Sequence, residues 1–344
     1  MAAIQHPPIP HTGPLASYWS RQVQELVLLP VTEFEAGQRE RHQLYSLLTM
    51  ALVACYWNGN KYGQQGNYPW RAKQRQPNQS GYVGGDYLGH NIASIAVDGQ
   101  GEVIDFDFNH NEILASSVEH AESRLIRRVF SLTQLFDDWD TADSGSQTGT
   151  VGEPFTPART PYSTLLNRVT IYTSLESCSQ CSGIMALGSV KAVVFLHRDP
   201  GQNSIGNILY NLRPQGERYL PPLPIPADTF GLSYFGELNA GYEQFAAELK
   251  NNPESCVFLP DDPSKKRERS PSVTSFLCTD LAHDVFNRAL QEFTQLKEVQ
   301  YPDFAPPQEE GQPKPHNNAW VLQHLQRFLS YAIRKGQRGT PHKL

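Results

Sequence analysis

The 344-residue sequence has no apolar run long enough to cross a membrane. Its longest such run, residues 44–57, is interrupted by Ser46 and Thr49, whereas a membrane-spanning helix needs about 20 apolar residues. Residues 1–13 have neither the basic start nor the apolar segment of a secretory signal peptide. We therefore expect no membrane association and a location in the cytoplasm, with the nucleus left open.

An excess of basic residues is also lacking. The chain has 29 lysine and arginine residues against 35 aspartate and glutamate residues, and its formal net charge is -6. Its overall field therefore does not attract nucleic acid, so such binding would have to come from local patches. Two stretches are basic, KKRER at 265–269 and RKGQRGTPHK at 334–343, but runs of this kind are more often solvated surface than binding sites.

The sequence has only five cysteines, an odd number, at positions 55, 178, 181, 256 and 278. In a cytoplasmic protein thiols stay reduced, and two cysteines close in sequence are more often metal ligands than a disulfide. Cys178 and Cys181 form such a pair, with two residues between them. We interpret Cys55, Cys256 and Cys278 as packing residues.

Hydrophobic periodicity predicts alternating helices and strands over the first two thirds of the chain. A turn at 98–101 joins the first two strands as a hairpin, and Ser117 is a candidate N-cap for the helix that follows. The predicted helices are 34–56, 117–132, 179–187 and 203–212, with a short one near 16–28, and the predicted strands are 92–97, 103–108, 169–173 and 192–196.

Breaker-rich stretches divide the chain into three parts. These are an N-terminal segment at 1–32, a main domain at 33–215 with loop insertions at 58–87 and 133–165, and a helical extension at 216–344. The proline-rich stretch 213–229 has room for a last sheet strand, and 281–296 and 322–333 predict amphipathic helices. Because each of these helices has one apolar face, we expect the extension to pack on the main domain.

Two motifs carry the chemistry of the sequence. VEHAESR places Glu122 two residues after His120, and SLESCSQCSG contains Cys178 and Cys181. Hydrolytic removal of an amine from a base ring needs a metal that lowers the pKa of a bound water, a carboxylate that moves protons, and a pocket that holds the base. A catalytic zinc has three protein ligands and one open position. His120 and the two cysteines can supply three ligands, while Glu122 stays off the metal.

The predicted secondary structure favours this grouping. His120 falls at the start of one helix and the cysteine pair at the start of the next, where the helix dipole stabilises thiolates. A purely structural zinc site is an alternative, and it would need a fourth protein ligand.

HAE at 120–122, SLESCSQCSGIM at 174–185 and KAVVFLHRDPG at 191–201 resemble motifs of the cytidine deaminase-like superfamily, in particular those of tRNA adenosine deaminase, guanine deaminase and their relatives. The zinc deaminase signature is H-x-E followed by P-C-x-x-C. The resemblance covers about residues 34–212 and not the C-terminal third. It implies an α/β fold, a three-layer α-β-α sandwich with a central five-stranded mixed sheet, to which the C-terminal helices are added.

The resemblance also implies roles for individual residues. Zn²⁺ would be the cofactor, Glu122 the proton shuttle, and Asn109 a hydrogen-bond partner of the target base. The implied metal ligands are His120, Cys178 and Cys181, and the implied pocket lining is Ser174, Leu175 and Glu176.

One residue departs from the family pattern, because Ser177 stands where the family has proline. Proline suits the first position of a helix, while serine can cap a helix with its hydroxyl. The change should cost about 1 kcal/mol of backbone rigidity without removing a ligand.

These features favour a zinc-dependent hydrolase of amidine C–N bonds that removes an exocyclic amine from a nucleobase. Adenine-type bases are favoured over cytosine, and the base is free, in a nucleoside or nucleotide, or within RNA or DNA. The alternative is an inactive deaminase fold that serves as a binding or scaffold subunit, against which the presence of Glu122 argues. Self-association into a homo-oligomer is expected from the resemblance alone.

Overall fold

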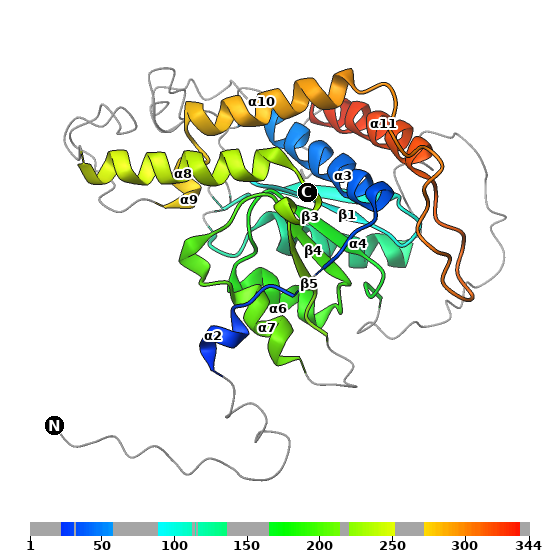
Figure 1. The fold of residues 1–344 in the computed structure, drawn as a ribbon, viewed down its shortest axis with the longest axis horizontal. Coiled ribbons are helices and arrows are strands. Elements are labelled where there is room, and N and C mark those ends of the chain that lie inside the picture. The colour runs from blue at the N-terminus through cyan, green and yellow to red at the C-terminus, as the bar shows by residue number, and fades with distance from the viewer. Residues whose placement is uncertain are drawn as a thin grey trace, which may run out of the picture.

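The computed structural model describes residues 22–30, 32–57, 89–111, 114, 116–135, 165–213, 220–251 and 272–337. The predicted insertions at 58–87 and 133–165 lie outside these residues, apart from 133–135 and 165, and so do Cys256 and the KKRER stretch. The described part forms one sheet between layers of helices (Figure 1). The predicted α/β sandwich is therefore confirmed.

The sheet has five strands in the order β2-β1-β3-β4-β5. Strand β1 pairs antiparallel with β2 and β3, whereas β3, β4 and β5 run parallel. The strands are β1 (Ala93–Val97), β2 (Val103–Phe108), β3 (Thr170–Thr173), β4 (Ala192–Phe195) and β5 (Leu223–Pro226). Because only β1 runs the opposite way, the carboxyl ends of the other four strands lie at one edge of the sheet.

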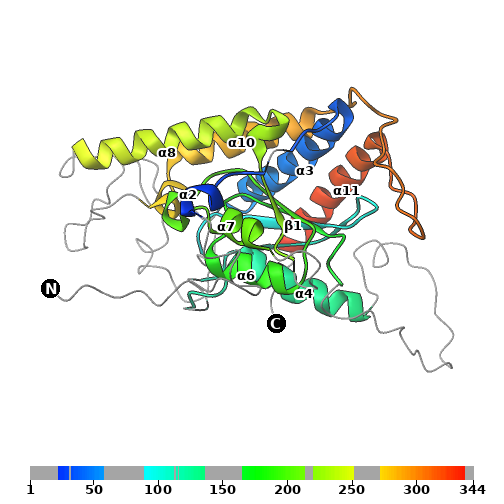
Figure 2. The ribbon, with the colours of Figure 1, turned by 60° about the horizontal axis from the view of Figure 1, so that its bottom comes forward.

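Each strand sends alternate side chains to opposite faces, as the period of two requires. On one face, Ile95, Tyr172 and Val194 belong to the large core cluster that includes helix α3. On the other, Ala96, Ile171 and Val193 belong to a smaller cluster with helix α4. The helices next to the sheet are α3 (Ala36–Cys55), α4 (Ala121–Leu135), α6 (Ser179–Leu187) and α7 (Ile205–Leu212). Figure 2 shows α3 above the sheet and α4 and α6 below it.

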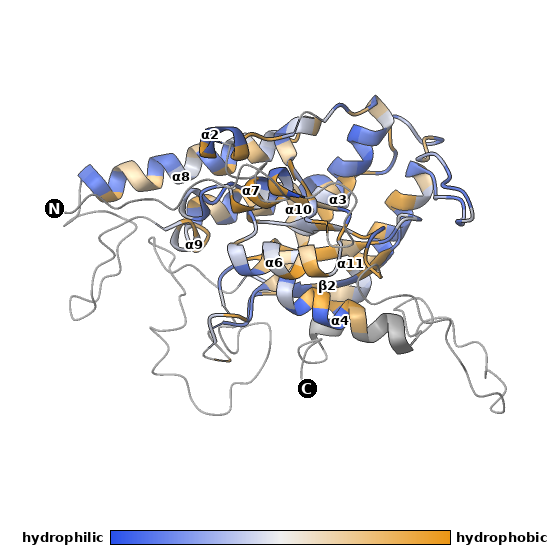
Figure 3. Cartoon of the chain, turned by 90° about the horizontal axis from the view of Figure 1, so that it is seen from below, coloured by the Kyte–Doolittle hydropathy of each residue, from blue (hydrophilic) through white to orange (hydrophobic). Residues whose placement is uncertain are grey.

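The C-terminal helices lie on the α3 side and share its core (Figures 1 and 2). Helices α10 and α11 contact α3 directly, and α8 runs beside α10. Their bounds are α8 (Ser233–Asn251), α9 (Val273–Phe276), α10 (Asp280–Gln295) and α11 (Asn318–Gln337). The predicted helices at 281–296 and 322–333 and the predicted last strand are confirmed, whereas α8 was not predicted. Seen from below, α4 and α8 both alternate hydrophilic and hydrophobic positions, as helices with one buried side do (Figure 3).

Two helix starts differ from prediction. Helix α4 begins at Ala121 rather than near Ser117, because Oδ1 of Asn109 accepts a hydrogen bond from the Ala121 amide at 2.8 Å. The capping group thus comes from the end of β2 and not from the residue just before the helix. The short N-terminal helix, α2, is limited to Val23–Leu26 among the residues described.

Among the described helices, none is both long enough and apolar enough to traverse a lipid bilayer.

Candidate metal centre and its pocket

The topology brings the two motifs together. The segments that follow β2, β3 and β4 all leave the sheet at the same edge, and such an edge is where α/β folds form ligand sites. The first segment leads to His120, which directly precedes α4, and the second to Cys178, the N-cap of α6. Cys181 is the third residue of α6, in its first turn. Helices α4 and α6 contact each other, so the three side chains converge.

The geometry of these side chains fits a zinc ion. Nδ1 of His120 lies 3.3 Å from Sγ of Cys178 and 3.7 Å from Sγ of Cys181, and all three ligand atoms lie within 4.8 Å of one another. In a tetrahedral site with Zn–N of about 2.0–2.1 Å and Zn–S of about 2.3 Å, a nitrogen and a sulfur ligand lie about 3.6 Å apart. The predicted ligands therefore form a candidate zinc site, with Nδ1 as the histidine ligand atom.

The electrostatics of the cluster favour thiolates. The neighbouring Cys181 side chain, together with the His120 ring, lowers the pKa of Cys178 to about 4. The nearby Cys178 side chain and burial raise the pKa of Cys181, while the hydrogen bond to Cys178 raises the pKa of His120. A cluster with one thiolate and one buried thiol suits a cation that binds sulfur ligands, such as Zn²⁺.

Glu122 lies beside this cluster and is almost fully buried. Its Oε2 accepts a hydrogen bond from the Cys181 thiol at 3.5 Å. Its Oε1 accepts hydrogen bonds from Oγ of Ser177 at 3.1 Å and from Oγ1 of Thr173 at 3.3 Å. Burial raises the pKa of Glu122 above its ordinary value, which suits a group that takes up a proton and gives it back.

Ser177 does not cap α6. Cys178 is the N-cap residue, and the first amide of α6, that of Ser179, donates to Oε1 of Gln202 at 3.4 Å. The expectation that the Ser177 hydroxyl serves the helix start is therefore wrong, because this hydroxyl is turned to Glu122 instead.

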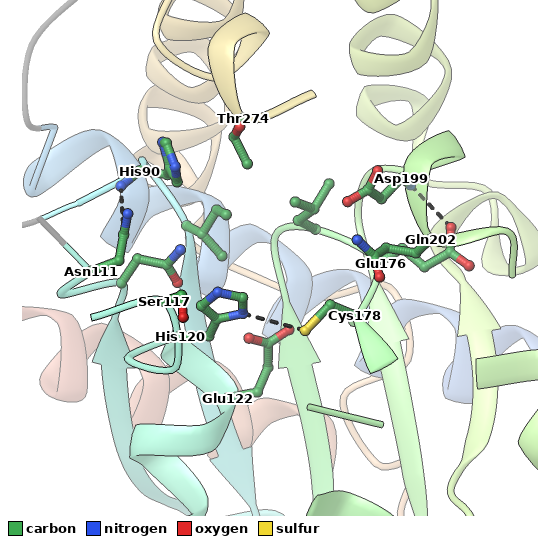
Figure 4. Close-up of a pocket in the computed structure, with 13 residues that line it drawn as sticks. His90, Asn111, Ser117, His120, Glu122, Glu176, Cys178, Asp199, Gln202 and Thr274 are labelled. Carbon is green, nitrogen blue, oxygen red and sulfur yellow. Dashed lines mark hydrogen bonds between the residues drawn. The ribbon is translucent and has the colours of Figure 1, made fainter. Parts of the chain in front are cut away.

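The candidate metal site lies at the base of a pocket of about 260 Å³. This volume is just below the roughly 300–1,000 Å³ typical of sites for drug-sized ligands, so it suits a single small ring. Figure 4 shows His120, Glu122 and Cys178 at its base, with Asp199 and Gln202 on one side and Asn111 and His90 on the other.

Three of the four residues implied to contact substrate lie in this pocket, namely Asn109, Leu175 and Glu176. The carboxamide oxygen of Asn109 is bonded to the α4 amide, so its amide nitrogen is the group it can offer to a ligand. Ser174 is not among the lining residues, because its amide and hydroxyl both pair with the backbone of Ala93 at the start of β1.

Two carboxyl groups stand at the side of the pocket. Oε2 of Glu176 accepts a hydrogen bond from the Asp199 amide at 3.0 Å, and the Asp199 carboxylate accepts one from the Gly201 amide at 2.9 Å. Burial raises the pKa of both groups. Asp199 lies in the motif at 191–201, which by itself indicates no role for this residue.

The C-terminal extension also reaches the pocket. Thr274, on α9, faces the metal cluster from above (Figure 4). A hydrogen bond of 2.9 Å from Nδ2 of Asn91 to the Leu277 carbonyl fixes α9 against the start of β1. Sequence reasoning missed Thr274 because no motif surrounds it and it is more than 90 positions from the cysteine pair.

No protein-family model and no curated protein matches this sequence. Solved structures that are similar to it include one from a study of A-to-I editing by tRNA:A34 deaminases, with 18% identity, 40% of this chain and 82% of that chain covered, and a TM-score of 0.26. Another is guanine deaminase from Nitrosomonas europaea, with 16% identity, 43% and 74% coverage, and a TM-score of 0.23. Because both TM-scores are low, these similarities identify no activity, and the function has to be inferred from the site residues.

Proposed function

We propose that this chain is a zinc-dependent hydrolase of the cytidine deaminase-like superfamily that removes an exocyclic amine from a nucleobase. The observation that carries the proposal is the cluster of His120, Cys178 and Cys181 with a buried carboxylate, Glu122, beside it in one pocket. The three ligands leave room for a fourth, and the carboxylate is held by hydroxyl groups rather than by the ligand side chains alone.

In this proposal the chain's own residues move the protons. Zinc, when bound, would lower the pKa of a water so that hydroxide is available near neutral pH. Oε2 of Glu122 faces the ligands, so the proton is taken up at this oxygen. Glu122 then delivers this proton to the ring nitrogen, takes the second proton of the former water and delivers it to the leaving amine, so that the oxygen stays on the base and ammonia is released. The raised pKa of Glu122 suits a group that must hold a proton between these two transfers.

The pocket walls would position the base. Asn109 has a free amide nitrogen, which donates to a ring or carbonyl acceptor next to the reacting carbon. Leu175 offers an apolar surface to the ring, and Glu176 is fixed by the Asp199 amide. Adenine-type bases are favoured over cytosine because the sequence motifs resemble the adenosine and guanine branch. The base is free, in a nucleoside or nucleotide, or within RNA or DNA, and the chain associates with itself.

The test is release of ammonia from adenosine, cytidine, guanine and short RNA and DNA oligomers by the zinc-loaded protein. Glu122→Gln should reduce turnover about 10²- to 10⁴-fold while keeping one zinc per chain, since it removes the proton carrier and no ligand. Glu243→Gln, on the exposed side of α8, is the matched control and should keep full turnover. Full turnover by Glu122→Gln, or no ammonia from any substrate with zinc bound, would contradict the proposal. Sedimentation of the same preparations measures self-association.

A further inference from the structure

Glu122 is held by two hydroxyl groups on a single oxygen. Ser177 and Thr173 both donate to Oε1, at 3.1 and 3.3 Å, and both residues are buried. The Thr173 hydroxyl accepts in turn from the Ser94 hydroxyl at 2.9 Å, on the neighbouring strand β1. Because Ser94 supplies the proton in that bond, the single proton of Thr173 is directed to the carboxylate.

A carboxylate in this place can do one of two things. Oε2 of Glu122 is already 3.5 Å from the sulfur of a candidate ligand, Cys181, and carboxylates are themselves zinc ligands. If Glu122 filled the fourth position, the site would be closed and would resemble a structural zinc site. A small rotation of the Glu122 carboxyl group toward the metal would therefore turn it from a proton carrier into a metal ligand.

We infer that Ser177 and Thr173 are positioning residues that hold the Glu122 carboxylate by Oε1 and keep it off the metal. The inference rests on the proposed function. Ser177 is available for this task because the first amide of α6, that of Ser179, donates to Oε1 of Gln202 instead. The Ser177 backbone is held by a hydrogen bond of 3.3 Å from the Ser182 hydroxyl to the Ser177 carbonyl. Ser177, first noted as a departure from a family pattern, thus supplies a bond that proline at this position lacks.

The variants are chosen to remove one hydroxyl at a time. Ser177→Ala and Thr173→Val remove single donors, Ser177→Ala combined with Thr173→Val removes both, and Ser177→Thr returns a hydroxyl to position 177. Ser46→Ala is the matched control, because Ser46 is equally buried but lies on α3, which carries none of the cluster residues.

Two readouts separate positioning from folding. In the zinc enzyme, Ser177→Ala should lower kcat roughly 10- to 100-fold with little change in KM, and Ser177→Thr should restore it. In the Co²⁺-loaded protein, which needs no substrate, the double variant should change the visible absorption bands, because the freed carboxylate enters the coordination sphere. Metal content should stay at one per chain in every variant.

The inference is overturned if Ser177→Ala matches Ser46→Ala in both kcat and the Co²⁺ spectrum. It is equally overturned if Ser177→Ala loses its metal, or if Ser177→Thr fails to restore kcat, because either result makes the residue structural. If the wild-type protein deaminates no base, the proposed function fails, while the Co²⁺ spectra of the double variant and of Ser46→Ala still decide whether the hydroxyl pair holds Glu122 off the metal.

Discussion

His324 makes the stability of this protein sensitive to acid. It lies on α11, is fully buried, and stacks on Trp320 with ring centroids 4.6 Å apart. Its Nε2 accepts a hydrogen bond from the Val103 amide at 2.9 Å, at the start of β2. Burial, with smaller contributions from nearby positive groups, lowers the pKa of His324 to about 4. Protonation of Nε2 would replace this acceptor by a second donor, so the folded state resists it.

The sign and size of the effect follow from proton linkage. Below pH 6.5, His324 binds a proton in the unfolded chain but stays neutral in the folded protein. The free energy of unfolding therefore falls as the pH is lowered from about 6.5 to about 4, and it is level below that. At pH 5 the loss from this one residue is about 2 kcal/mol. His197 is fully buried and His42 is partly buried, and burial lowers the pKa of each to about 4, so each should add a loss of the same sign.

Urea unfolding at pH values from 7.5 to 4.5 measures this loss. His324→Leu should be less stable than wild type at pH 7.5, because the Val103 amide loses its acceptor. From pH 7.5 to pH 5 it should lose about 2 kcal/mol less than wild type, since Leu does not titrate. Both proteins are measured with chelator present, so that protonation of the metal ligands contributes equally. Parallel stability–pH curves for the two proteins would refute the reasoning.

Three further predictions concern other parts of the molecule. Gly101→Ala should lower the free energy of unfolding, measured in urea, by about 2 kcal/mol. The backbone φ is +99° there, and a Cβ would overlap the Arg41 guanidinium. Gly236→Ala in α8 is the control and should cause no such loss, because a Cβ there has no neighbouring atom within 4 Å. Removing zinc with a chelator should lower Tm. The free energy of unfolding should fall by about 4 kcal/mol if free zinc was present at 1,000 times its Kd. A His120→Ala variant should show no such response. Thr274→Trp should raise KM severalfold with one zinc per chain retained, because it narrows the pocket from the C-terminal side; an unchanged KM would show that Thr274 does not border the substrate.

The sequence predicted those features that depend on local spacing. The hairpin, α3 and the two amphipathic helices follow from the period of their apolar residues, and the ligand cluster follows from short motifs at the ends of strands. Helix α8 was missed because Gly236 and Gly241 interrupt an otherwise helical pattern. Gly241 is needed there, since a Cβ would lie 3.0 Å from the Phe276 ring of α9.

What could not be predicted depends on contacts between distant residues. The start of α4 is set by Asn109, twelve positions upstream of Ala121, and no local capping rule identifies it. The bond from Ser177 to Glu122 requires β3 and α4 to be placed side by side. Helix propensity and residue spacing predict neither the start of α4 nor this bond, because both consider only residues within a few positions of one another.

The position of α3 between the sheet and the C-terminal helices has a consequence for how the protein is made. Arg41 of α3 donates a hydrogen bond of 2.8 Å to the His316 carbonyl, 275 positions later, and Asn318 donates one of 2.9 Å to the Gly37 carbonyl. While the chain is being synthesised, α3 is complete long before these partners leave the ribosome, so its outer surface stays exposed through most of translation. Contacts of such large sequence separation slow folding, and exposed apolar helices of this kind are the surfaces that chaperones bind. A nascent chain stopped before residue 316 should therefore remain an aggregation-prone intermediate, although every residue of the metal cluster has already been made.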